Sequence, residues 1–380
     1  MDLYIFLQHY WWFIVSLLGA LLVFLMFIQG GNSLLFQIGK TDQERDMLVL
    51  LTGRKWEFTF TTLVTFGGAF FASFPLFYST SFGGAYWAWM LLLFTFILQA
   101  VSYEFQNKLG NLLGKQTYQF FLVLNGVLAP FLVGVVVGTF FSGSDFVIDK
   151  SNFANIGMPV ISVWKNPAHG LEALLVPLNV LLGLSVLFLS RILGALYYIS
   201  RTDEAYVQTR SRKALWIDAV LFLVTFLPSV GLILSKDGYA VVDSMIVMEP
   251  FKYFHNFMEC GGVLFLVFLA GVLLVLTGLL RTLFSKSFTG GIWPTGLGTI
   301  LAVLSLLMNA GFFNTAYYPS NIDLQSSLTI ANSCSSLFTL KTMAFVSILI
   351  PFVLLYIIYA WRSLENKKEK MADTEKSEDL

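Results

Sequence analysis

Nine long apolar stretches alternate with polar connections along this chain of 380 residues. A bilayer core about 30 Å thick requires roughly 20 apolar residues per helix, and these stretches are long enough to cross it. Because every backbone N–H and C=O must be satisfied inside the membrane, the stretches predict helices. They are too long and too uniformly apolar for the strands of a β-barrel. The predicted spans are residues 11–30, 56–78, 85–105, 118–142, 171–198, 214–235, 262–284, 294–314 and 341–361.

The composition supports an all-α integral membrane protein. Hydrophobic residues make up 57% of the chain and charged residues only 12%, whereas a soluble domain needs roughly 25% charged residues to cover its surface. A basic start typical of a cleavable signal peptide is missing, and the first apolar stretch has the length of a span. The net charge of zero argues against nucleic acid as a partner.

Lys and Arg gather on every second connection between the predicted spans. Most of the 23 Lys and Arg residues follow the first, third, fifth and seventh spans or lie in the C-terminal tail. Positively charged connections stay in the cytoplasm, so the N-terminus is predicted outside and the C-terminus in the cytoplasm. An odd number of spans requires ends on opposite sides, in agreement with the charges.

The candidates for chemistry are polar residues at the predicted cytoplasmic ends of the spans. Trp56 and Glu57 open the second span, Glu104 closes the third, and Gln29 and Asn32 close the first. A carboxyl group partly withdrawn from water exchanges protons near neutral pH, so these residues form a candidate proton path. The alternative is that both glutamates are interfacial residues that reach water, with Trp56 in the aromatic belt.

Other polar residues within the spans have structural explanations. Asp218 lies near Arg212 and Lys213 in the sequence and is interpreted as one member of an ion pair at the interface. Arg191 lies deeper, where snorkelling or pairing with an acid of a neighbouring helix or subunit explains it. Asn125, Asn179 and Asn309 are interpreted as residues that hold helices together.

The sequence offers no candidate metal or cofactor site. His9, His169 and His255 all lie outside the middle of the spans, so a bis-His haem site across the membrane is excluded. No nucleotide-binding glycine pattern and no Ser/His/Asp arrangement occur, so redox metals would belong to a partner. Cys260 and Cys334 lie on predicted outer connections, where two free thiols are favoured over a disulfide.

Several short motifs in a fixed order point to one family. They are Trp11-Trp12, Trp56-Glu57, the run Gly67–Tyr78, Phe82-Gly83-Gly84-Ala85-Tyr86, Asn166-Pro167, Asp237-Gly238-Tyr239, Pro319-Ser320 and Ser327-Leu328-Thr329-Ile330. In order and spacing, over almost the whole chain, these motifs resemble subunit II of cytochrome bd quinol oxidase.

The resemblance implies a terminal oxidase that couples quinol oxidation to the reduction of O2 to water. This chain would be its haem-free subunit, without catalytic residues of its own, in the bacterial cytoplasmic (inner) membrane. It would support subunit I, which carries haem b558, haem b595 and haem d, and provide cytoplasmic proton uptake through Glu57. A structural quinone, membrane lipid and a small single-helix subunit are further expected partners.

The resemblance also implies two four-helix bundles plus one peripheral helix. The expected boundaries are 1–142 for the first bundle, 143–170 for an outer connection, 171–314 for the second bundle, 315–364 for an outer loop with the peripheral ninth helix, and 365–380 for a cytoplasmic tail. The tail is rich in Glu, Lys, Asp and Ser, a composition that predicts disorder.

The chain departs from the family's usual motifs at polar positions. The first-span motif usually has two acids, whereas this chain has Gln29-Gly30-Gly31-Asn32. An amide cannot release a proton, so the role implied for Asn32 is to hold a water. The second and third motifs keep their acids as Glu57 and Glu104, and these two residues carry the proton role over.

A secondary transporter is the alternative function. Pro130, Pro177 and Pro228 interrupt three of the spans, and transporters use broken helices to build sites near the bilayer midplane. The ionisable residues of this chain lie near the ends of the spans instead, which favours the oxidase subunit.

Overall fold

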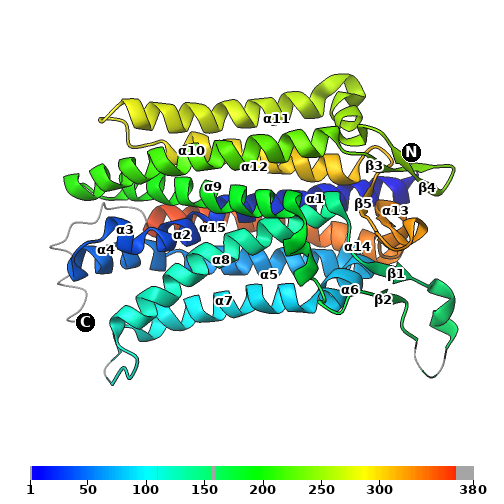
Figure 1. Ribbon diagram of the computed structural model, residues 1–380, viewed down its shortest axis with the longest axis horizontal. Coiled ribbons are helices and arrows are strands. Elements are labelled where there is room, and N and C mark those ends of the chain that lie inside the picture. The colour runs from blue at the N-terminus through cyan, green and yellow to red at the C-terminus, as the bar shows by residue number, and fades with distance from the viewer. Residues whose placement is uncertain (1, 109, 156, 158, 365–380) are drawn as a thin grey trace.

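The computed structural model describes residues 2–108, 110–155, 157 and 159–364. Long helices run side by side along the molecule, and three two-stranded sheets lie at the end that contains the N-terminus (Figure 1). We call this the hairpin end. The other end, where the short helices α3 and α4 lie, is called the opposite end.

The first half of the chain contains both long and short helices. Its helices are α1 (Leu3–Leu25), α2 (Phe27–Ser33), α3 (Leu35–Ile38), α4 (Asp42–Gly53), α5 (Trp56–Ser73), α6 (Pro75–Gly84), α7 (Tyr86–Phe105) and α8 (Lys115–Ser142). The second half continues with α9 (Pro177–Arg201), α10 (Ala205–Ser235), α11 (Lys252–Phe284), α12 (Ile292–Gly311), α13 (Ile330–Ser333), α14 (Leu337–Ser347) and α15 (Ile350–Leu364).

The strands form antiparallel pairs in the connections at the hairpin end. The pairs are β1 (Phe146–Ile148) with β2 (Ser162–Trp164), β3 (Gly238–Val242) with β4 (Met245–Glu249), and β5 (Ala316–Tyr318) with β6 (Leu328–Thr329). Short 3-10 helices η1 (Lys150–Ala154), η2 (Leu171–Leu175) and η3 (Leu324–Ser326) complete these connections.

The prediction of an all-α membrane protein is confirmed, although the count of nine spans is not. Eight helices in the described residues are long and apolar enough to cross a membrane, with α1–α2 and α14–α15 each counted once. The predicted span 56–78 is not among them. Helix α5 carries four threonines and Glu57, and it ends where Phe74 leaves helical geometry and Pro75 begins α6. Proline disfavours a helical residue before it.

Several predicted spans start later than the helices that contain them. The span predicted at 214–235 lies in α10, which starts at Ala205. The span predicted at 11–30 lies in α1 and α2, which together start at Leu3 and end at Ser33. Charged residues such as Arg210 end the apolar run but not the helix. The span predicted at 262–284 begins at a kink in α11, where residues 259–262 have non-helical backbone angles.

Glycine allows α2, α8 and α9 to approach one another backbone to backbone. A Cβ atom on Gly30 would lie 1.7 Å from the carbonyl oxygen of Ser190, and one on Gly194 would lie 2.2 Å from the amide nitrogen of Gly31. A Cβ atom on Gly126 would lie 2.5 Å from the carbonyl oxygen of Gln29. Small residues drive helix association in membranes because they permit this close packing.

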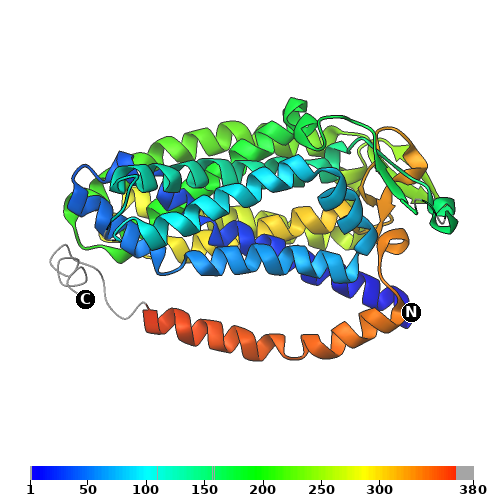
Figure 2. The ribbon, with the colours of Figure 1, turned by 90° about the horizontal axis from the view of Figure 1, so that it is seen from below.

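Helices α14 and α15 form the expected peripheral segment on the outside of the molecule (Figure 2). At one end the Trp11 indole donates to the carbonyl of Leu340, with the two atoms 3.3 Å apart. At the other end the Lys55 ammonium lies 3.9 Å from the centroid of a Trp361 ring. The predicted disordered tail, 365–380, lies outside the described residues. Cys260 and Cys334 are free thiols.

Candidate functional site

A cluster of buried amide and hydroxyl side chains joins α2 to α7. The Gln29 amide donates to the Gln99 side-chain oxygen at 3.1 Å, and the Tyr103 hydroxyl donates to the Asn32 side-chain oxygen at 2.8 Å. Gln29, Asn32 and Gln99 are all fully or almost fully buried. We call Gln29, Asn32, Gln99 and Tyr103 the amide cluster.

The amide cluster holds more hydrogen-bonding atoms than its members can satisfy. Oε1 of Gln29, Nδ2 of Asn32 and Nε2 of Gln99 are buried and have no hydrogen-bond partner in the described part of the chain. The Tyr198 hydroxyl on α9 is also buried and without a hydrogen-bond partner in the described residues. It lies next to α2, since a Cβ atom on Gly31 would be 3.0 Å from it. Buried unpaired polar groups cost about 1–3 kcal/mol each, and ordered water usually satisfies them. The arrangement is therefore suited to hold water.

The predicted residue Trp56 borders the amide cluster, whereas the two predicted acids project to the surface. The Trp56 ring stacks on the Tyr103 ring, with centroids 6.0 Å apart and planes inclined by 21°. Glu57 lies in the first turn of α5 and Glu104 in the last turn of α7, and both side chains are exposed. The structure thus brings Trp56 and Asn32 together through Tyr103, which the sequence reasoning had not identified.

A second polar group surrounds Arg191 on α9. Its guanidinium donates to Asp218 on α10 at 2.8 Å, to the Ser33 hydroxyl at 3.2 Å and to the Gln37 side-chain oxygen at 2.8 Å. The side chain of Asp218 is 1% exposed and that of Arg191 is 16% exposed. The interpretation of Arg191 as the partner of an acid on a neighbouring helix is confirmed. Asp218 is a member of an ion pair, as expected, but its partner is Arg191 and not Arg212, which donates to backbone carbonyls after α11.

An ion pair joins α4 to α10 at the opposite end. Glu44 caps α4 together with Thr41 and accepts a hydrogen bond from Arg210 on α10 at 2.6 Å. Burial alone would raise the pKa of the Glu44 carboxyl, but hydrogen bonds from the backbone of Lys40 and Thr41 and from Arg210 lower this pKa below its ordinary value.

The asparagines predicted to hold helices together, Asn125, Asn179 and Asn309, do so and also hold connections. Asn179 accepts from Ser142 at 2.8 Å and donates to a backbone carbonyl of η2 at 3.1 Å. Asn309 donates to the carbonyl of Tyr253 at 2.8 Å. Asn125 lies 3.5 Å from a threonine hydroxyl of α7.

The histidines of this chain do not fit a haem site. His9 contacts a carbonyl of its own helix at 2.8 Å, His169 contacts the carbonyl of Gly84 at 2.9 Å, and His255 contacts Glu249 at 2.9 Å. They belong to three different elements and face three different partners, so no two of them form an axial pair. Among the described residues no three or more His, Cys, Asp or Glu side chains gather as metal ligands.

Comparisons with known proteins agree in one family. The family described as "Cytochrome bd terminal oxidase subunit II" matches residues 7–364. The chain is 26% identical to the "Probable cytochrome oxidase subunit 2" of Haemophilus influenzae over 95% of each chain, and 25% identical to the "Cytochrome bd-I ubiquinol oxidase subunit 2" of Escherichia coli K12 over 93% of each. A chain of the bd oxidase from Geobacillus thermodenitrificans has the same fold, with a TM-score of 0.64 at 12% identity over 98% of both chains.

Proposed function

This chain belongs to the cytochrome bd terminal oxidase subunit II family, and we propose that it gives its oxidase a proton uptake route that begins at Glu57. As subunit II it is part of a quinol:O2 oxidoreductase, which oxidises quinol and reduces O2 to water, and it is not catalytic alone. The complex implies a partner, subunit I. Membership in this family decides against the secondary transporter.

The protein is a multi-pass protein of the inner membrane, and we propose that its opposite end faces the cytoplasm. The support is the gathering of Lys and Arg on the connections at that end, among them Lys40, Arg45 and Lys115. The hairpin end and the N-terminus would then lie outside. We further propose that residues 1–142 and 171–314 are the two helix bundles.

The haems are proposed to lie in subunit I, because the histidines of this chain do not fit an axial pair. When bound there, haem supplies electron transfer and the binding of O2. Helices α7, α10 and α11 present many exposed apolar side chains. These surfaces support the further proposal that lipid, a quinone and a small single-helix subunit contact this chain.

The observation that carries the proton route is the set of unpaired atoms in the amide cluster. Water molecules bound to the unpaired atoms of Asn32, Gln29 and Gln99 would form the inner part of the proton route. They would lie behind the stacked rings of Trp56 and Tyr103, as seen from the surface. Glu57 and Glu104 are exposed at the ends of helices that flank this cluster, where a carboxylate collects protons from the cytoplasm. In this route Asn32 holds water and does not itself release a proton.

The test uses the assembled oxidase in liposomes with Glu57→Gln. We expect slower quinol oxidation and slower proton uptake from the cytoplasmic side, with haem content unchanged. Glu259→Gln is the matched control, because Glu259 is exposed at the hairpin end. Turnover and uptake that stay at the wild-type level in Glu57→Gln would refute the proton role and leave family membership untouched.

A further inference from the structure

A group of positive charges without acidic partners lies at the opposite end, where α10 and α11 meet. Lys213 on α10, Arg281 on α11 and Lys286 in the connection that follows α11 are all exposed. None of the three forms an ion pair within the described part of the chain. We propose that these three residues, which we call the basic patch, bind the phosphate of an anionic phospholipid in the membrane leaflet beside them.

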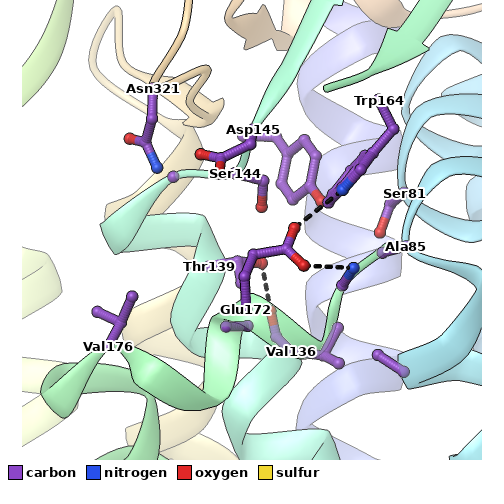
Figure 3. Close-up of a pocket in the computed structure, with 15 residues that line it drawn as sticks. Ser81, Ala85, Val136, Thr139, Ser144, Asp145, Trp164, Glu172, Val176 and Asn321 are labelled. Atoms are coloured by element: carbon purple, nitrogen blue, oxygen red, sulfur yellow. Dashed lines mark hydrogen bonds between the residues drawn. The ribbon is translucent and has the colours of Figure 1, made fainter. Parts of the chain in front are cut away.

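Several charged groups elsewhere in the structure have partners of their own. At the same end Lys115 pairs with Asp46 at 2.8 Å. At the hairpin end Glu172 lines a cavity of about 110 Å³, and its two oxygens accept from the Trp164 indole at 2.9 Å and the Gly170 N–H at 2.7 Å (Figure 3). Asp and Glu contribute little to membrane orientation, so orientation alone does not account for the lack of acids beside the basic patch.

Arg212 fixes the connection that carries Lys286. Its guanidinium donates to the backbone carbonyls of Ser285 at 3.2 Å, Lys286 at 3.0 Å and Phe288 at 3.2 Å. The guanidinium carbon of Arg281 lies 4.3 Å from the centroid of the Phe288 ring. These contacts hold the members of the basic patch near one another, and the charge of Arg212 adds to theirs because its partners are neutral carbonyls.

Exposed apolar side chains continue from the basic patch along both helices. Trp216 lies one turn from Lys213, and Phe284 lies one turn from Arg281, so each ring shares a helix face with a cation. The two rings meet edge to face, with centroids 5.8 Å apart. Further along, the exposed residues are Val220, Val224 and Leu227 on α10 and Leu269, Leu273 and Leu280 on α11. A ligand with a charged head and long apolar chains fits this surface, whereas a soluble phosphate would leave the apolar part unused.

The charge of the basic patch favours an anionic phospholipid over a zwitterionic one. A zwitterionic headgroup would bring its own ammonium close to Lys213 and Lys286, whereas an anionic headgroup offers phosphate oxygens to these cations and to the guanidinium of Arg281. Each Lys or Arg near the surface raises the affinity for anionic lipid about fivefold. This inference rests on the lipid contact of α10 and α11 proposed above, and the proposed orientation assigns the lipid to the cytoplasmic leaflet.

The experiment measures quenching of Trp216 fluorescence by brominated phospholipids, with the assembled oxidase in micelles of a neutral detergent. Bromine quenches an indole only at short range, so the difference between each protein and its Trp216→Phe form reports on lipid at the basic patch. We expect half-maximal quenching at a mole fraction of brominated phosphatidylglycerol at least about tenfold lower than that of brominated phosphatidylcholine. Lys213→Gln, Arg281→Gln and Lys286→Gln should each reduce this preference about two- to fivefold, and the triple variant should abolish it.

Lys115→Gln is the matched control, because Lys115 is a cation of the same end that is paired with Asp46, and it should leave the preference unchanged. The haem content of every variant is measured, so that a loss of assembly is not mistaken for a loss of lipid binding.

Equal quenching by the two lipids, or a preference for phosphatidylglycerol that the triple variant keeps, would overturn the assignment of the basic patch. Quenching by neither lipid would mean that another subunit covers it and would also refute the lipid contact of α10. Displacement of brominated phosphatidylglycerol by millimolar glycerol phosphate would identify a site for soluble phosphate and would refute the lipid. The proton route through Glu57 is tested separately and is unaffected by any of these outcomes.

Discussion

The Arg191–Asp218 pair permits a quantitative test of how the helices are held together. Asp218 is almost completely buried, and its second oxygen has no hydrogen-bond partner in the described residues. Arg191 is partly exposed and also contacts Ser33 and Gln37. The two members of the pair therefore differ in what their removal leaves behind.

Replacing the arginine should cost more than replacing the acid. Arg191→Met leaves a buried carboxylate without a counter-charge, and breaking a buried pair in this way costs about 3–5 kcal/mol. Asp218→Asn keeps an acceptor for the guanidinium, which retains its other bonds, so we expect a loss of about 1–3 kcal/mol. The double variant Arg191→Met with Asp218→Leu exchanges the pair for apolar side chains and should recover most of the stability.

The assay is the thermal unfolding midpoint of the purified complex in detergent, followed by circular dichroism for the two single variants, the double variant and Asp218→Leu alone. A double-mutant cycle isolates the interaction between the two sites. If Arg191→Met is no more destabilising than Asp218→Asn, or if the double variant loses the sum of the single losses, then the pair is not isolated from water and does not hold α9 to α10 as a buried ion pair.

Three further predictions follow from the packing. Gly30→Ala places a methyl group 1.7 Å from a backbone oxygen of α9, so we expect a loss of stability above about 1–3 kcal/mol. The measurement is the yield of assembled complex, which should fall. The control Gly68→Ala meets open space and should assemble normally. The hydrogen bonds of Glu44 lower the pKa of its carboxyl. The stability that the ionised carboxylate gives the folded protein is therefore complete above about pH 4.3 and is lost as the pH falls through the folded-state pKa. When the pH is lowered, the melting midpoint of Glu44→Gln should fall less than that of the wild type. Trp361→Ala removes a cation–π contact with Lys55, worth about 0.5–2 kcal/mol, and should increase trypsin cleavage at the end of α15; unchanged cleavage would contradict this attachment.

Most of the fold was predictable because hydropathy determines the depth of a residue in the membrane. The apolar runs in the sequence predicted the positions of most helices. Asn125, Asn179 and Asn309 were correctly interpreted as residues that hold helices together. The interruption at Phe74 and Pro75 was not foreseen, because α5 and α6 are both apolar enough to form one continuous stretch in the sequence. The three small sheets were also missed, since their strands are only two to five residues long.

The candidate site was only half predictable, because the partners of its residues lie far away in the sequence. Gln29 and Asn32 were found from their depth, but their partners Gln99 and Tyr103 are 70 and 71 residues distant. The same is true of Arg191, whose partner Asp218 is 27 residues further on. Depth alone cannot show which helices face each other.

Rotation about a helix axis is harder to read in a membrane protein, because lipid and protein interior are both apolar. On α7 the exposed face carries large apolar side chains such as Met90, Phe94 and Ile97. The buried face carries smaller and polar ones, among them Thr95, Gln99 and Ser102, at intervals of three and four residues. Those intervals place them on one side of a helix, and polar or small residues mark the packed side in membranes. This spacing is the signal that would have predicted that Gln99 faces α2.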